Sequence, residues 1–202
     1  KNPLASLAGS IQILKEELSY SSENHKLMQI VLRETDRLNS LVSDFLLFAK
    51  PPQGNLEKVK LGRALKETLE LFEKDADCAD RLSIDRKLLP DIWVEMDPVH
   101  LRQVLWNLLL NASEAIEGSG TIFVTMDSHG ARKVSIAVAD TGVGIPEVFL
   151  KDIFDPFFTT KARGTGLGLS IVHRILESYA SRLDVESAPG IGTTFRFRLN
   201  RV

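Results

Sequence analysis

The chain of 202 residues is 44% hydrophobic and 26% charged, which gives enough apolar content for one core or two small ones and argues against wholesale disorder. Its 25 Lys and Arg and 27 Asp and Glu leave a formal charge of −2 without a long basic run, which argues against nucleic-acid binding. Apolar stretches such as residues 104–110 are far shorter than the ~18 to 20 residues that span a bilayer, and the N-terminus does not read as a signal peptide. The single cysteine, Cys78, allows neither an internal disulfide nor a thiolate zinc cluster, so a reducing, cytoplasmic setting fits best.

The N-terminal part is predicted to be a helical hairpin. Apolar residues spaced three and four apart predict one helix over residues 4–20, polar residues at 21–24 interrupt the pattern, and the stripe resumes over residues 27–48. Two helices with such narrow stripes leave much of each stripe uncovered, and pairing with a second copy as a four-helix bundle would cover them. We therefore expect a homodimer formed through residues 1–50.

A domain boundary is predicted after residue 50. Pro51 and Pro52 end the second helix, because proline removes a backbone donor and disfavours helical geometry in the residue before it. Residues 51–56 read as a linker and residues 57–202 as a mixed α and β domain. Its expected helices span residues 61–76, 98–116 and 168 to about 179, and its expected strands span residues 57–60, 82–85, 92–96, 121–127, 133–140, 183–187 and 194–199. The sheet is expected to be antiparallel around residues 121–140.

The first cluster with chemical content is the pair Asn107 and Asn111. On a helix these positions lie one turn apart on the same face, so two amide side chains project side by side from an apolar segment. Amide oxygens suit a hard cation such as Mg²⁺. For an isolated pair the alternative is local hydrogen bonding by one amide and solvation of the other.

The second cluster, Asp140-Thr-Gly142-Val-Gly144, follows a predicted strand. Such a motif alone is often only a turn. As a functional motif, its carboxylate can accept a hydrogen bond from an exocyclic amine, and its glycines let a planar base approach the backbone. This combination describes an adenine pocket.

The third cluster is a glycine-rich stretch that leads directly into a helix: Gly164, Thr165, Gly166, Leu167 and Gly168. Glycines before a helix N-terminus expose backbone donors and the positive end of the helix dipole, which together bind phosphate. The stretch does not follow a buried parallel strand and lacks a Gly-Lys-Ser/Thr ending, so neither a Rossmann nor a Walker motif is indicated.

Aromatic residues precede this stretch. Phe154, Phe157 and Phe158 are either core residues or anchors of a hinged lid, and Lys161 is the candidate cation for terminal phosphates. A fourth cluster, residues 190–195 with Thr194, reads equally well as a tight hairpin or as part of the site.

In this order the clusters resemble the N, G1, F, G2 and G3 boxes of the sensor histidine kinases of two-component systems, and the resemblance covers essentially the whole chain. The ATP-binding part looks like the α/β sandwich shared with gyrase, the Hsp90 chaperones and the MutL repair proteins, with ATP under a mobile lid. The hairpin resembles the dimerisation and histidine-phosphotransfer domain. The resemblance thus implies an α+β protein with a helical hairpin followed by this sandwich.

Residues 1–7 resemble the tail of the family's H box, most closely that of kinases of the nitrogen-regulator and pilus-sensor type. The match places the phosphoacceptor histidine just before Lys1, so we expect a kinase core truncated after that residue. None of His25, His100, His129 and His173 lies in an H-box context. The turn at residues 179–181, Tyr-Ala-Ser, also departs from the family's usual His-Gly-Gly-like turn.

The resemblance implies a role for each cluster. Asp140, Gly142 and Gly144 would bind adenine, and Asn111 and Asn107 would hold Mg²⁺. Residues 164–168, Lys161 and Thr194 would bind the rest of the ATP. A histidine imidazole would then attack the γ-phosphate, which is relayed to an aspartate of a response regulator.

Two other functions are weighed against this one. Gyrase-like and Hsp90-like ATPases carry a glutamate where this chain has Asn107, so activation of water is disfavoured. Without its histidine, the chain would alternatively be a nucleotide-gated dimerisation and docking module for a response-regulator receiver domain. A membrane anchor, in the inner membrane, is left open for the full-length parent protein.

Asn2 would lie one helical turn after the expected histidine, where related kinases use an amide or threonine to orient water for dephosphorylation of the response regulator. Asn2 is therefore a candidate phosphatase residue. The equally weighted alternative is that it only precedes Pro3 and tolerates a kink.

Overall fold

The computed structural model describes residues 54–74, 81–130, 132–161 and 164–202, together with helical positions between residues 28 and 46. The chain divides into two compact units, residues 1–50 and residues 51–202, each of which is described by itself. Within the described ranges, no helix has the length and apolar character needed to cross a membrane. The expected first helix, the turn after it and Asn2 lie outside the described residues.

In the first unit, every described position between residues 28 and 46 is helical, in agreement with the apolar stripe. The Thr35 hydroxyl donates to the carbonyl oxygen of Val31 at 2.8 Å, one turn earlier in the helix. Several apolar side chains of this segment are exposed in the single chain: Ile30, Val31, Leu38, Val42, Phe45 and Leu46. The helix therefore presents an apolar surface that association with another helix would bury.

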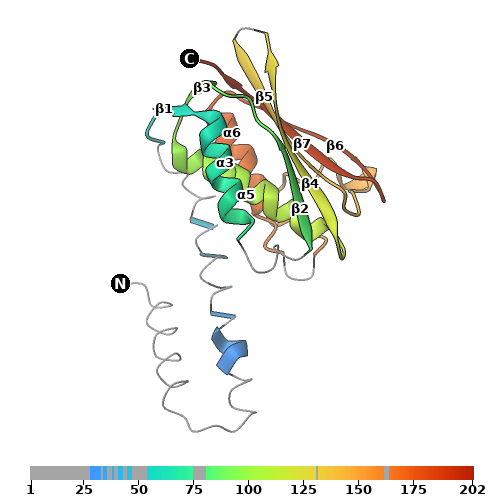
Figure 1. Cartoon of the computed structure of the whole chain (residues 1–202). Coiled ribbons are helices and arrows are strands. Elements are labelled where there is room, and N and C mark those ends of the chain that lie inside the picture. Colours follow the sequence, from blue (N-terminus) through green and yellow to red (C-terminus); the bar gives the residue numbers. More distant parts are fainter. Residues whose placement is uncertain are drawn as a thin grey trace. The chain divides into compact units, whose positions relative to one another are not determined.

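The second unit is an α/β sandwich built on a five-stranded sheet (Figure 1). In spatial order the strands are β2 (Leu82–Lys87), β4 (Gly120–His129), β5 (Lys133–Asp140), β7 (Gly192–Asn200) and β6 (Leu183–Ala188). β2 pairs with β4 in parallel, and the other three pairings are antiparallel. The antiparallel pairing expected around residues 121–140 is the β4–β5 ladder.

Three helices cover one face of this sheet: α3 (Leu61–Phe72), α5 (Pro98–Ala115) and α6 (Gly168–Ser178) (Figure 1). α5 packs against both other helices and against β4, β5 and β7. Phe72 of α3 meets Trp106 of α5 edge to face, with ring centroids 5.4 Å apart. Beneath the helices, alternate side chains of the central strands, such as Ile122 and Val124, are fully buried. The expected α+β fold class is confirmed.

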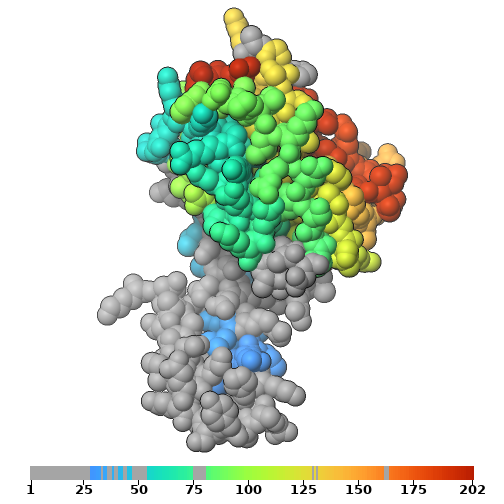
Figure 2. Space-filling model, viewed as in Figure 1, coloured from blue at the N-terminus to red at the C-terminus, as the bar shows by residue number. Residues whose placement is uncertain are grey.

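A short two-stranded sheet lies near the start of the unit. β1 (Glu57–Lys60) pairs antiparallel with β3 (Trp93–Met96), and β3 is tied to the end of the chain because the backbone N–H of Val202 donates to the Trp93 carbonyl at 3.0 Å. In the space-filling view, the teal side chains of β1 and α3 lie beside green ones, and red side chains of the C-terminal strands are seen both at the right and at the top, next to the teal and green ones (Figure 2). A single 3-10 turn, η1 (Glu147–Phe149), follows β5.

Candidate functional site

Asn107 and Asn111 project from α5 toward the first residue of α6. Both amides are half-buried and flank three consecutive leucines of the helix. A Cβ atom added to Gly168 would lie 3.7 Å from Asn107 Oδ1 and 3.9 Å from Asn111 Nδ2. The structure thus brings together the amide pair and the glycine-rich helix start that the sequence predicts.

The N-terminus of α6 is open for an anion. Among the described residues, no side chain caps the helix, whose N-cap position is the buried Leu167. In the preceding loop, Thr165 Oγ1 accepts from the backbone N–H of Leu167 at 3.2 Å, which fixes the turn without using the donors of the helix itself. The first N–H groups of α6 and the positive end of its dipole therefore face the amides of α5 and can bind phosphate.

The loop before α6 is anchored by aromatic residues. Phe154 lies against His173 of α6 with ring centroids 5.4 Å apart, and Phe158 lies 5.7 Å from Phe149. Phe157 is 59% exposed, and its backbone N–H donates to the carbonyl of Gly166 at 2.9 Å. Two of the three predicted aromatic residues thus act as anchors, and Phe157 holds the glycine loop through its backbone rather than its ring.

Lys161 lies at the edge of the amide pair. Its ammonium is 2.5 Å from Glu114 Oε2 and 3.5 Å from Asn111 Oδ1, and both charged side chains are exposed. Glu114 follows Asn111 by three positions, so both lie on one face of α5. Glu114 was not among the residues predicted for the site, although its helical spacing from Asn111 was a usable signal.

Asp140 ends β5 with a carboxylate that is only 8% exposed. Its Oδ1 accepts from the backbone N–H groups of Gly142 at 2.8 Å and Thr193 at 3.3 Å. Burial raises the pKa of Asp140, an effect opposed by these two N–H groups and by the charge of Lys161. Oδ2 has no hydrogen-bond donor among the described residues, which leaves it able to accept from the amine of a ligand.

The loop after Asp140 is clamped between α5 and the β6–β7 turn. The backbone N–H of Val143 donates to the carbonyl of Ala115 at 2.9 Å, and the N–H of Gly190 donates to the carbonyl of Val143 at 2.8 Å. A Cβ on Gly142 would lie 2.4 Å from the same Ala115 carbonyl oxygen, so only glycine permits this approach. The predicted Gly-x-Gly motif therefore packs directly on the end of the helix that carries the amides.

The β6–β7 hairpin brings Thr193 to Asp140, and the predicted site residue Thr194 is its neighbour in the strand. Side chains alternate across a strand, and Thr194 lies opposite Ala139, on the sheet face away from the helices. Thr193 lies on the buried face and its N–H binds Asp140. Gly192 has a φ of +126°, and a Cβ there would lie 1.9 Å from the Asp140 carbonyl oxygen. Thr194 is thus not brought to Asp140, whereas its neighbour is.

Arg81 holds the end of α5 in place and was also missed. Its guanidinium donates to the carbonyl of Ile116 and to the carbonyl and hydroxyl of Ser113, at 2.9 to 3.0 Å. These bonds satisfy carbonyls that a helix C-terminus leaves without partners. Because the residues lie more than 30 positions apart in the chain, no local pattern indicates the contact.

The described residues contain no group of three or more His, Cys, Asp and Glu that could hold a metal ion. A hard cation at this site would rest on the amide oxygens of Asn107 and Asn111 together with phosphate oxygens, a donor set that suits Mg²⁺. The Lys161 ammonium beside Asn111 Oδ1 indicates that this oxygen faces a position compatible with positive charge. The site can therefore bind a purine amine at one end and a polyphosphate at the other.

Comparison with known proteins agrees with this geometry. Residues 96–202 match the family described as "Histidine kinase-, DNA gyrase B-, and HSP90-like ATPase", which defines the second unit as an ATP-binding domain of that class. Residues 1–54 match the "His Kinase A (phospho-acceptor) domain". With both domains in this order, the chain belongs to the sensor histidine kinases of two-component systems and contains the two domains that these models describe.

Individual relatives support the same family. The sensor histidine kinase ZraS of Escherichia coli O157:H7 is 41% identical over 198 residues, which is 96% of this chain and 42% of ZraS. Full-length ShkA in complex with AMPPNP is 26% identical with a TM-score of 0.77, covering 99% of this chain and 46% of ShkA. Histidine kinase ThkA in complex with the response regulator protein TrrA is 28% identical with a TM-score of 0.75, covering 98% and 58%. The chain spans less than half the length of ZraS.

Proposed function

We propose that this chain binds ATP with Mg²⁺ and transfers the γ-phosphate to a histidine side chain. The observation that carries the proposal is the meeting of Asn107 and Asn111 with the uncapped start of α6 at Gly168. Amide oxygens that can bind a hard cation lie there beside backbone N–H groups that can donate to phosphate oxygens. This juxtaposition suits a polyphosphate chelated by a divalent cation.

Each residue of the site then has a defined task. Asp140 accepts a hydrogen bond from the adenine amine through Oδ2, and Lys161 moves from Glu114 to the terminal phosphates. Asn111 and Asn107 would hold Mg²⁺, which neutralises phosphate charge when bound. The imidazole nitrogen forms a bond to the γ-phosphorus as the bond to the bridging oxygen breaks, and ADP leaves.

The residue one turn before Asn111 favours transfer to histidine over hydrolysis. A carboxylate there would be suited to activate water, whereas Asn107 carries an amide that is not a base at neutral pH. Steady-state ATP hydrolysis by this chain alone is therefore expected to be slow.

The partners of the proposed kinase are a second copy and a response regulator. The exposed apolar side chains between residues 30 and 46 support a homodimer built through the hairpin. ThkA is described in complex with a response regulator, which supports a receiver domain as the acceptor of the phosphoryl group here. A cytoplasmic location and a role for Asn2 in dephosphorylation are part of the same proposal, because phosphorylation and dephosphorylation both act on a cytoplasmic response regulator.

A mixed-dimer experiment tests the proposal. The chain is combined with a second chain that is extended at its N-terminus to carry the expected H-box histidine and that bears Asp140→Ala, and acid-labile label from γ-labelled ATP is followed. Label on the extended chain supports ATP binding and transfer by the present chain. ATP binding without label, in both the mixture and the extended chain with Asp140 intact, would favour a docking module. Absence of ATP binding would refute the site.

A further inference from the structure

A second polar cluster lies at the ends of α5 and α6 that are remote from the nucleotide site. Asp97 directly precedes α5, and Tyr179 directly follows α6. The Tyr179 hydroxyl accepts from the backbone N–H of Asp97 at 3.1 Å and lies 2.8 Å from His100 Nδ1. At ~1.5 Å per residue, α5 separates Asp97 from Asn107 by about 15 Å and from Asn111 by about 21 Å.

The linker that enters the domain rests on this cluster. The backbone N–H of Asn55 donates to Asp97 Oδ2 at 2.7 Å. A Cβ on Gly54 would lie 2.5 Å from the Tyr179 hydroxyl oxygen and 2.9 Å from the His100 ring, so no side chain fits at this position without displacing one of them. Residues 54 and 55 are thus held by one hydrogen bond and one close contact.

Asp97 and Tyr179 are hydrogen-bonded on both sides of the cluster, whereas His100 Nε2 is buried without a partner among the described residues. Asp97 uses Oδ1 to cap α5 through the N–H of Val99 at 2.7 Å and keeps Oδ2 for the linker. The Tyr179 hydroxyl accepts from the backbone of Asp97 and shares a second hydrogen bond with Nδ1 of His100, a residue that is only 3% exposed. Burial raises the pKa of Tyr179, which keeps its hydroxyl neutral.

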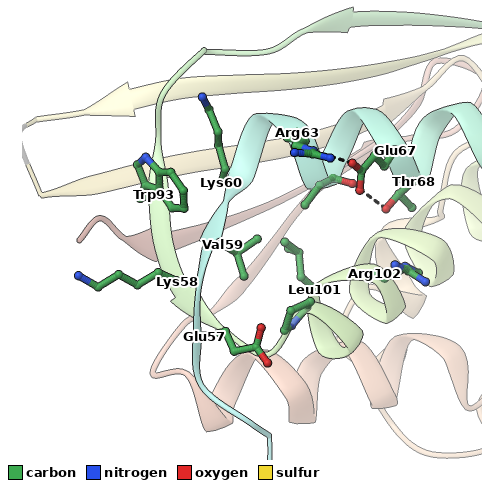
Figure 3. A pocket seen from close by; sticks show the side chains of 12 residues that line it. Glu57, Lys58, Val59, Lys60, Arg63, Glu67, Thr68, Trp93, Leu101 and Arg102 are labelled. Carbon is green, nitrogen blue, oxygen red and sulfur yellow. Dashed lines mark hydrogen bonds and ion pairs between the residues drawn. The ribbon is translucent and has the colours of Figure 1, made fainter.

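A hollow of about 310 Å³ lies beside the first turn of α5, lined by residues of β1, α3 and β3 (Figure 3). Val59 of β1 and Leu101 of α5 both line this hollow. β1 itself is held by its ladder with β3, and the described contacts of residues 54 and 55, which precede it, are with Asp97, His100, Tyr179 and Glu57.

We propose that Asp97 and Tyr179 are positioning residues that fasten the linker to the remote ends of α5 and α6. This attachment helps to place the bound γ-phosphate at the histidine imidazole during phosphoryl transfer. The inference rests on the proposed function. Transfer requires in-line placement of the γ-phosphate and the imidazole, and a loosened linker lowers the effective concentration of one group at the other. It also gives a role to the tyrosine in the turn that departs from the family pattern.

Two substitutions separate this role from folding. Asp97→Asn keeps a good N-cap oxygen for Val99 but replaces the oxygen that accepts from Asn55 with an amide that cannot accept. Tyr179→Phe removes only the hydroxyl. The matched control is Ser178→Ala, which removes a hydroxyl one residue away that bonds only the carbonyl of Ile175 in its own helix.

Three measurements are made on the chain extended to carry the H-box histidine: ATP affinity, the rate of autophosphorylation at saturating ATP, and hydrogen exchange at the Asn55 amide. Asp97→Asn and Tyr179→Phe are expected to lower the rate about 3- to 10-fold with ATP affinity unchanged within about twofold, the scale of one hydrogen bond. Exchange at Asn55 should accelerate in Asp97→Asn. Ser178→Ala should change none of the three.

The outcomes distinguish the two proposals. Equal losses of ATP affinity and rate in both variants would show a structural role only, and an unchanged rate with unchanged exchange would refute the fastening. A wild-type chain that neither binds ATP nor transfers its γ-phosphate refutes the proposed function. In that event the fastening is decided by exchange at Asn55 alone, which must accelerate in Asp97→Asn.

Gly54→Ala provides an independent route to the same contact. Its added methyl group meets the Tyr179 hydroxyl oxygen, so the substitution should lower the transfer rate as Tyr179→Phe does. Combined with Tyr179→Phe, its effect should be smaller than the product of the two single effects, because both act on one contact. Multiplicative effects would contradict a shared role.

Discussion

Replacing Asp140 with asparagine separates the charge of this side chain from its internal hydrogen bonds. Asparagine retains an oxygen that can accept from the N–H groups of Gly142 and Thr193, now made by Oδ1 at 2.8 and 3.3 Å. What changes is the second oxygen, which becomes an NH₂ donor, and the negative charge, which is lost. The substitution is therefore expected to affect stability and nucleotide binding in opposite directions.

The effect on stability follows from the raised pKa of Asp140, whose main cause is burial. A carboxyl whose pKa is higher in the folded than in the unfolded state contributes stability below the unfolded pKa of about 3.9 and loses it as the pH rises through the folded pKa. At pH 7 the buried charge thus lowers the free energy of unfolding. Asp140→Asn should equal or exceed wild type in stability at pH 7, and its advantage should shrink toward pH 4.

The effect on binding is a loss of affinity for ATP. A hydrogen bond to a charged acceptor contributes about 1.5–3 kcal/mol, so losing Oδ2 as acceptor predicts about 10- to 150-fold weaker binding. The new NH₂ group also faces the adenine amine, donor against donor. Inosine triphosphate, which carries a carbonyl in place of that amine, should lose far less affinity or gain some.

Titration of a fluorescent nucleotide, with ATP and inosine triphosphate as competitors, measures both affinities, and chemical denaturation at pH 7 and pH 4 measures both stabilities. Asp184→Asn is the matched control, because it makes the same chemical change in an exposed carboxylate paired with Arg198 on the solvent face of the sheet. ATP binding by Asp140→Asn at wild-type strength, or an equal loss of affinity for both nucleotides, would refute the role assigned to Oδ2. A stability deficit that grows from pH 4 to pH 7 would refute the burial argument.

Two further predictions concern the frame of the site. Gly192→Ala should lower the free energy of unfolding by about 2 kcal/mol or more, because the φ of Gly192 is +126° and the new Cβ would meet the Asp140 carbonyl. A denaturation midpoint equal to that of wild type would contradict this prediction. Arg81→Lys keeps the charge but not the geometry that reaches Ser113 and Ile116 together. We therefore expect the free energy of unfolding to fall by about 1.5–3 kcal/mol, which lowers the midpoint of thermal unfolding by roughly 3–12 °C. The control is Arg198→Lys on the exposed face of the sheet, which should shift the midpoint little.

Features set by local spacing could be predicted from the sequence. The four-residue interval between Asn107 and Asn111 places both on one helix face, and the glycines at 166 and 168 predict a loop that leads into a helix. The helices and strands of the second unit were expected within a few residues of their observed ends. The helix expected over residues 61–76 ends at Phe72, followed by a turn at residues 73 and 74.

Features set by long-range pairing could not be predicted from the sequence. The parallel pairing of β2 with β4 depends on a crossover that contains α5, and nothing in the six residues of β2 specifies its direction. The register of β7 against β5 decides that Thr193, and not Thr194, belongs to the buried face. A shift of one residue reverses this assignment, and two adjacent threonines give the sequence pattern no means to choose.

The order in which the site receives its parts has a consequence for synthesis of the chain. The ribosome delivers the amides of α5 first, then Asp140, then the start of α6, and the Thr193 amide that completes the carboxylate pocket only with the last strand. A nascent domain that lacks β7 therefore has no finished adenine pocket. Cellular ATP can stabilise only domains in which the final hairpin has docked, so the nucleotide favours completed chains over partly synthesised ones.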